Sequence, residues 1–421
     1  MATPQFEAES ETQPAIDSDS DTGESSSNVQ PPRKRARTDG RAAPRGVRDE
    51  KYYFADGSCV LLVEETLFNV HKTMLSRDSS SFAAMFDLPQ GEGPMEGTSD
   101  ESPIVLCGDS VEEFRNFLWA MYALPAELMI VHTAHADLSK LIDIARVSNK
   151  YSFKSLETWA LDAIQEYMHR PETPPVPLAL RNPLEPLYFA PAFKPGSGRI
   201  SSLLRLAHLC NHAKLLGTMV ALLKRLMVGS LPYAYLAMCL ADELNIRELR
   251  GTAYLEVMQK TEVIARDHVE IPIITTPDDR GGEEDEDSPE ITLAPDGRLV
   301  VSFLQKHRLR CGYHGLSQAW EHMRLHPPQF DHTSSCGATW HQHGCTQSWM
   351  EFWKEKSRSE GVLALRPADV MGRLRAIAKE FDKWGSATYM HHDCRLSAKR
   401  LIQEKLKQVE EALPDYFSEE E

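Results

Sequence analysis

The amino-acid sequence predicts an α+β domain at residues 50–170, with a small sheet first, a helical pack after it, and mostly helical regions beyond. Three observations support this. Short strand-like runs cluster near residue 60, helical spacing of apolar residues dominates from residue 111 onward, and strands do not alternate with helices. At 421 residues, the chain is long enough for two or three domains of ordinary size.

Residues 1–49 are expected to form a disordered tail that is acidic first and basic afterwards. The first 30 residues carry seven acidic side chains and no basic one, so they cannot bury enough apolar area to offset the entropy of ordering. A short basic cluster follows, made of Arg33, Lys34, Arg35 and Arg37. Such a cluster on an unfolded tail favours nuclear import, with a cytoplasmic location otherwise. A solvated charge run remains the alternative.

The sheet is expected to begin with a hairpin. Asp56-Gly57 marks a turn, Cys59–Val63 has the composition of a buried strand, and Leu67–Val70 that of a returning strand after a turn at residues 64–66. Two short helices should follow, because apolar side chains recur closely and residues 79–81 supply a serine N-cap between them. Those apolar side chains are Met74, Leu75, Phe82, Met85 and Phe86.

A loop rich in Gly, Pro and acidic residues is predicted at residues 87–103, and Ile104–Leu106 should be a third strand. Ser110-Val111-Glu112-Glu113 has the spacing of a capping box, which predicts a helix start. The apolar residues after it fall on one helix face: Phe114, Phe117, Leu118, Met121 and Tyr122. The same spacing recurs near residues 138–145 and 156–167, which predicts two more helices.

Beyond this domain, composition divides the chain into four further parts. Residues 171–198 are rich in proline and predict a linker, residues 199–265 a helical region, residues 266–294 an acidic linker, and residues 295–415 a mostly helical C-terminal domain. We expect Pro414 to stop the final helix.

The hairpin sequence closely resembles the opening of BTB/POZ domains. The residues that carry this resemblance are Asp56, Leu67, Phe68, Val70, His71, Lys72, Phe82, Met85 and Phe86, and the strand at 104–106 and the helices follow in the family's order. The layout is also similar to that of uncharacterised fungal BTB-domain proteins. The resemblance implies short strands capped by helices, homodimers in many members, and binding to other proteins. Many members place an Asp where this chain has Cys59, so homodimer and monomer both stay open.

The resemblance implies no chemistry, and we expect no catalytic residue and no cofactor. His71 is a structural position of the family, and no nucleophile or paired carboxylate accompanies it in the pattern. His322 and His326 share a helix face, but the glutamate precedes the first histidine, which excludes the hydrolytic zinc motif. Both are expected to be surface residues. Trp349, Phe352 and Trp353 lie at core-face spacing, although with Trp340 they could also bind a peptide or ligand.

The C-terminal region contains several zinc-ligand types, of which Cys311, Cys336, His341 and Cys345 are the candidates. No cysteine pair has the short spacing of a finger or ribbon, so packing is favoured over metal.

Charge and composition limit the function further. Lys plus Arg total 46 against 62 Asp plus Glu, and a net charge of −16 makes direct nucleic-acid binding improbable. The most apolar stretch, Leu203–Met227, carries several basic residues, so no membrane association is expected. The sequence therefore predicts a protein-interaction or assembly protein, a homodimerising adaptor. The alternatives are a nuclear transcriptional regulator and a substrate adaptor that binds a cullin-type ubiquitin-ligase scaffold.

Overall fold

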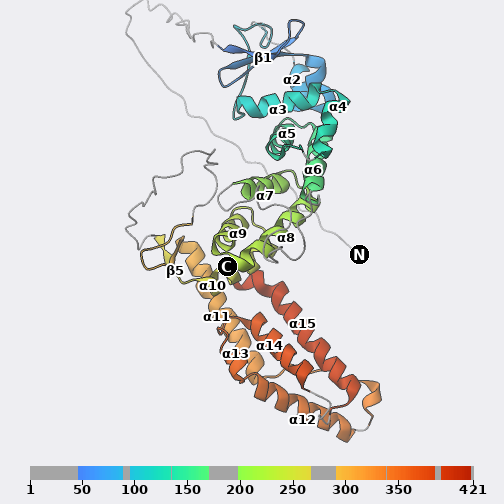
Figure 1. Cartoon of the computed structure of the whole chain (residues 1–421), viewed down its shortest axis with the longest axis vertical. Helices are drawn as coiled ribbons and strands as arrows, with labels where there is room; N and C mark the ends of the chain where they lie inside the picture. Colours follow the sequence, from blue (N-terminus) through green and yellow to red (C-terminus); the bar gives the residue numbers. More distant parts are fainter. Residues whose placement is uncertain are drawn as a thin grey trace, which may run out of the picture. The chain divides into compact units, whose positions relative to one another are not determined.

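The computed structural model describes residues 46–88, 95–133, 135–169, 198–266, 291–337, 339–384 and 390–418 (Figure 1). The basic cluster at Arg33–Arg37, nearly all of the Pro-rich segment and most of the acidic segment lie outside these residues. The expectations for those segments therefore stay predictions.

The first sheet has the strand order β1-β3-β2-β4. β2 (Cys59–Val63) and β3 (Thr66–Val70) form the expected antiparallel hairpin, with Leu61 opposite Phe68. β4 (Ile104–Leu106) pairs in parallel with β2, as a third strand. β1 (Val47–Tyr53) pairs in parallel with β3 and was not expected from the sequence. Only Asp49 and Tyr52 of β1 are buried, so its apolar pattern is too weak to indicate a strand.

The two faces of this sheet are covered differently. The inner face packs against helices, in a core that includes Leu61, Phe68 and Val70. The outer face carries Val60, Leu62 and Leu67, which are at most 5% exposed and pack with Tyr53. Arg48 lies over the Tyr53 ring, and Asp100 accepts a hydrogen bond from the Tyr53 hydroxyl at 2.5 Å. Thus the N-terminal strand and the 95–103 segment close the outer face.

The helices of this domain follow the predicted order. α1 (Lys72–Leu75) and α2 (Ser81–Phe86) are short, and Ser80 caps α2. α3 (Val111–Tyr122) begins with the predicted capping box, in which the side chains of Ser110 and Glu113 each accept from the other's backbone N–H. α5 (Leu138–Lys150) and α6 (Lys154–His169) are the two further helices expected from the sequence. The sequence did not predict α4 (Pro125–Leu128), a single turn after α3.

Four helices extend this pack: α7 (Arg199–Leu209), α8 (Ala213–Gly229), α9 (Leu231–Glu243) and α10 (Arg247–Lys260). α7 contacts α5, and α8 contacts α6. The Gln165 amide donates to the Thr218 hydroxyl at 3.1 Å across the second contact. One continuous apolar core therefore runs from the helices of the first domain into this region.

The C-terminal region is mostly helical, as expected. It consists of α11 (Phe303–Leu325), α12 (Thr339–Lys356), α13 (Glu360–Leu363), α14 (Val370–Lys383) and α15 (His392–Tyr416). A two-stranded parallel sheet of β5 (Val263–Ala265) and β6 (Leu299–Val301) precedes it and was not predicted, because three apolar residues also fit a helix end.

The expectation that Pro414 stops the last helix is wrong. α15 continues to Tyr416, with Pro414 inside its last turn. This turn packs against α10 and α11: the Tyr254 and Phe417 rings lie 5.3 Å apart, and Arg247 forms an ion pair with Asp415 at 2.6 Å. These contacts hold the helix end in place despite the missing N–H of proline.

Within the described residues, no helix combines the length and the apolar character that crossing a membrane would take.

Candidate functional site

Three large apolar side chains are exposed in the segment that connects α3 to α5: Leu124, Met129 and Ile130, which are 67%, 60% and 46% exposed. We call these three residues the 124–130 patch. The backbone beneath it is held firmly. Glu127 accepts a hydrogen bond from the Leu124 N–H at 2.8 Å, and Val131 is buried as an anchor. The three large side chains are therefore presented on an ordered surface, which is typical of an interaction site.

A cavity of about 370 Å³ lies next to this patch. Leu128, which lies between Leu124 and Met129 in the sequence, is part of its wall. Asp78 and Ser155 form a polar edge, where the Ser155 hydroxyl donates to the Asp78 carboxylate at 2.9 Å. The remaining wall residues are mostly apolar: Met74, Arg77, Ala120, Met121, Phe153, Leu156 and Trp159. A pocket of this composition suits an apolar side chain from another protein.

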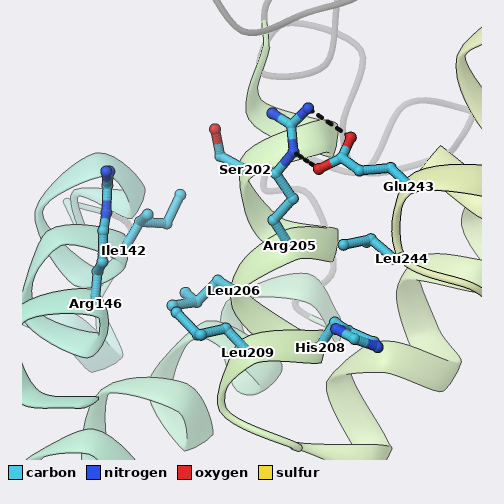
Figure 2. Close-up of a pocket in the computed structure, with 9 residues that line it drawn as sticks. All are labelled: Ile142, Arg146, Ser202, Arg205, Leu206, His208, Leu209, Glu243 and Leu244. Atoms are coloured by element: carbon cyan, nitrogen blue, oxygen red, sulfur yellow. Dashed lines mark hydrogen bonds and ion pairs between the residues drawn. The ribbon is translucent and has the colours of Figure 1, made fainter. Parts of the chain in front are cut away.

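A second cavity, of about 360 Å³, lies between α5, α7 and α9 (Figure 2). Arg205 faces Glu243 there and donates two hydrogen bonds to its carboxylate, at 2.7 and 2.8 Å. This paired geometry lowers the pKa of Glu243 through the Arg205 hydrogen bonds. On the opposite wall, Arg146 forms an ion pair with Glu113 at 2.9 Å. Both guanidinium groups are thus engaged in contacts between helices, so we regard this cavity as structural.

Most residues of the motif that resembles BTB/POZ domains have structural positions in the hairpin or beside it. Leu67, Phe68 and Val70 are buried in β3, whereas the Asp56 side chain is 86% exposed. His71 follows the strand, and its ring nitrogen Nδ1 lies 3.0 Å from the Tyr122 hydroxyl of α3.

The other motif residues stay close to this strand end. Lys72 begins α1 and lies over the Phe86 ring of α2. In α2, Phe82 is buried in the core, against which Met85 and Phe86 pack. The motif therefore joins the end of the hairpin to the helices.

Buried charge in this domain is paired. Asp49 of β1 is 4% exposed and accepts hydrogen bonds from Arg115 and from the backbone N–H groups of Lys51 and Tyr52. Burial raises the pKa of Asp49, but these donors outweigh it and leave the pKa below its ordinary value. Asp109 accepts from Lys150 at 2.7 Å and from the Tyr151 hydroxyl at 2.5 Å. Both carboxylates connect elements of the fold.

The C-terminal candidates for zinc divide into two groups. The sulfur atoms of Cys336 and Cys345 lie 3.8 Å apart, and both residues are buried. Cys311 is exposed on α11 beside His307, and His341 is exposed on α12 beside Trp340. Among the described residues, neither Cys311 nor His341 belongs to the group of possible ligand atoms that lie within 4.8 Å of one another around Cys336.

Two further residues lie close to Cys336. Ligand atoms of Cys336, Cys394 and His332 all lie within 4.8 Å of one another. Burial raises the pKa of the Cys336 thiol, and the neighbouring thiols of Cys394 and Cys345 raise it further, to about 12. The sequence did not single out His332 and Cys394 as members of this group, because the proximity of Cys394 to Cys336 depends on how the start of α15 packs against η5 (Ser334–Cys336) and the residues just before it.

The aromatic and histidine expectations are confirmed in this region. Trp349, Phe352 and Trp353 are at most 1% exposed and form a core face, whereas Trp340 is 70% exposed. His322 and His326 are stacked on the exposed side of α11.

Residues 50–166 match the family model of the BTB/POZ domain. This match covers the sheet from β1 onward and the helices through most of α6. No curated protein matches the chain.

Proposed function

We propose, from the premise that residues 50–166 form a BTB/POZ domain, that this chain is a non-catalytic adaptor that associates with a second copy of itself. BTB/POZ domains are protein–protein interaction modules, and the match to that family carries the proposal. The 124–130 patch supplies the surface, because removing three large apolar side chains from water lowers the free energy of a complex.

A second copy is a suitable occupant of this patch. In a two-fold dimer the same surface meets itself, so an apolar patch is complementary to its own copy. The outer face of the sheet is a poorer candidate, because Val60, Leu62 and Leu67 are already covered. The 124–130 patch is exposed and needs no rearrangement of the described residues before contact.

Co-purification of two differently tagged copies of the full chain tests this proposal. We expect the two copies to co-purify, and we expect the double variant Met129→Glu, Ile130→Glu to abolish it, because two charges would be buried in the contact. Phe303→Glu is the matched control: Phe303 is 68% exposed at the first position of α11, where a carboxylate is favourable. Equal co-purification of all three proteins would refute the role of the patch.

A specific observation supports a second candidate, a substrate adaptor for a cullin-type ubiquitin-ligase scaffold. α7–α10 continue the helical side of the domain without a break in the core, and His212, the N-cap residue of α8, lies 3.8 Å from Asp162 of α6. A helical extension of this kind is what scaffold-binding members commonly carry. Calorimetry of a purified cullin-type scaffold with the chain tests it: we expect binding that Leu128→Glu, in the cavity beside the patch, weakens at least tenfold.

We also propose that the chain enters the nucleus, which the cluster Arg33, Lys34, Arg35 and Arg37 supports. A fluorescent fusion should accumulate in the nucleus, and replacing the four residues with alanine should spread it into the cytoplasm. As a control of similar charge change, Lys399, Arg400, Lys405 and Lys407 of α15 can be replaced instead, and the fusion should stay nuclear. A nuclear signal that survives the first replacement would contradict the role of the cluster.

A further inference from the structure

Three buried cysteines and one histidine converge where η5, α12 and the start of α15 meet. The cysteines are Cys336, Cys345 and Cys394, which are at most 3% exposed, and the histidine is His332. The Cys336 and Cys345 sulfurs are 3.8 Å apart, and the Cys394 sulfur lies 3.6 Å from Nδ1 of His332.

These separations are the ones that a tetrahedral zinc ion imposes. With Zn–S bonds of about 2.3 Å and Zn–N bonds of about 2.05 Å, two sulfur ligands lie about 3.8 Å apart and a sulfur and a nitrogen about 3.6 Å apart. Cys336 connects the two measured pairs, because ligand atoms of His332, Cys336 and Cys394 lie within 4.8 Å of one another. Cys345 lies outside this group of three and reaches it through its 3.8 Å contact with the Cys336 sulfur, so it would turn toward the ion as the fourth ligand.

The hydrogen bonds of His332 are compatible with a proton on Nε2 and a lone pair on Nδ1, the nitrogen that faces the cluster. The Thr346 hydroxyl donates to the Gln342 carbonyl at 3.0 Å, so its oxygen accepts the N–H of His332 Nε2 at 2.9 Å. A neutral imidazole with its proton on Nε2 has a lone pair on Nδ1, the atom nearest Cys394. Metal-binding histidines are oriented by this kind of hydrogen bond on the far nitrogen.

A backbone donor also points at one of the sulfur atoms: the N–H of His391 donates to the Cys345 sulfur at 3.2 Å. Gly337 follows Cys336 with φ +67°, a left-handed conformation that bends the chain directly after this ligand.

We propose that His332 Nδ1 and the thiolates of Cys336, Cys345 and Cys394 bind one Zn²⁺ in a closed structural site. The four ligands come from three separate parts of the chain, so the ion joins the 330–336 segment, the first half of α12 and the first turn of α15. Three thiolates and an imidazole fill all four positions of zinc, which leaves none for water or substrate. The site therefore stabilises the C-terminal region and has no catalytic role.

The alternative use of two cysteines 3.8 Å apart is a disulfide between Cys336 and Cys345. A disulfide would leave Cys394 and His332 without a shared partner. The zinc site and the disulfide predict a different metal content and a different mass of the chain, so both measurements on one preparation distinguish them.

The test is the metal content of the full chain, purified under reducing conditions without added chelator and measured by inductively coupled plasma mass spectrometry. We expect one zinc per chain. After exchange with Co²⁺, we expect sulfur-to-cobalt charge-transfer absorption in the near ultraviolet and intense tetrahedral bands in the visible. A metal-free chain that takes up no Co²⁺, or one whose mass shows a Cys336–Cys345 disulfide, would overturn the proposal.

Substitutions assign the ligands. Cys394→Ser and His332→Ala should each lose the zinc, whereas Cys311→Ser and His341→Ala, which lie outside the cluster, should keep it. Thr346→Val should weaken zinc affinity by about 10- to 100-fold, because it removes the acceptor that orients His332. Zinc content unchanged in Cys394→Ser would contradict the site, and the cobalt spectrum of the unaltered chain decides the matter even if that variant does not fold.

Discussion

Nε of Arg115 on α3 lies 2.7 Å from a carboxylate oxygen of Asp49 on β1, and this contact joins the N-terminal strand to the helical side of the domain. Arg115→Met should destabilise the chain by about 1–2 kcal/mol, because it leaves the buried Asp49 carboxylate without its charged partner. This destabilisation is smaller than that of a fully buried ion pair, because the Arg115 side chain is 43% exposed to water. Thermal unfolding of both proteins measures the difference in stability.

The pH dependence of this loss follows from Asp49. Its pKa is lowered in the folded chain, so its stabilising contribution is present above the unfolded pKa and disappears as pH falls through the folded value. The difference between the two proteins should therefore shrink on acidification. As a control, Arg48→Met removes an exposed ion pair with Asp100 and should change the melting temperature little. If Arg115→Met and Arg48→Met lowered the melting temperature equally, the buried Asp49 carboxylate would not be the cause.

Asp143 of α5 should respond to pH in the opposite direction. Burial raises its pKa to about 6, while Asn116 donates to its carboxylate at 2.9 Å. A raised pKa means that the protonated form stabilises the fold, and this contribution is lost as pH rises through 6. Asp143→Asn should therefore stabilise the chain at pH 7.5, by at most about 3 kcal/mol, and have little effect at pH 4. Urea unfolding measures the stability of Asp143→Asn and of the unaltered chain at each pH. A stability difference between them that does not change with pH would exclude this explanation.

Gly312 of α11 allows close contact with Phe417. A Cβ at this position would lie 2.0 Å from the Phe417 ring, so Gly312→Ala should cost about 2–3 kcal/mol or more through overpacking. Gly217 of α8 is the matched control, because an added Cβ would meet nothing within 4 Å. Gly217→Ala should stabilise the chain by about 0.5–1 kcal/mol through helix propensity. In denaturant unfolding, the two variants should change the free energy of unfolding in opposite directions. A change in the same direction would mean that α11 and the C-terminus are not packed as described.

Removal of zinc should be visible through Trp349. Its indole N–H donates to the Pro328 carbonyl at 2.7 Å, and Phe330 packs between Trp349 and His332. A chelator should therefore lower the melting temperature and shift tryptophan emission to longer wavelength. Cys394→Ser should start from the lower melting temperature and show no response to the chelator. An emission shift that persists in Cys394→Ser would place the chelated metal elsewhere.

Much of the first domain could be predicted from sequence, because its signals are local. The capping box at Ser110 and Glu113 and the buried run of β2 depend on neighbouring residues only. β1 could not be predicted, because four consecutive charged residues, Arg48–Lys51, occupy its middle and its pairing with β3 is a tertiary contact. The same limit applies to the zinc ligands. Cys336 and Cys345 were candidates, but Cys394 joins them only through the packing of α15.

The 124–130 patch also escaped prediction. Leu124, Met129 and Ile130 are ordinary core residues by composition, and only the turn of α4 places them at the surface.

The most direct test of the central claim is the molar mass of the full chain in solution, measured by light scattering over a concentration series. Self-association through the BTB/POZ domain predicts twice the 47.5 kDa of one chain, falling to the single-chain mass on dilution or in the Met129→Glu, Ile130→Glu variant. A mass of one chain at every concentration would contradict the claim that a second copy covers the 124–130 patch.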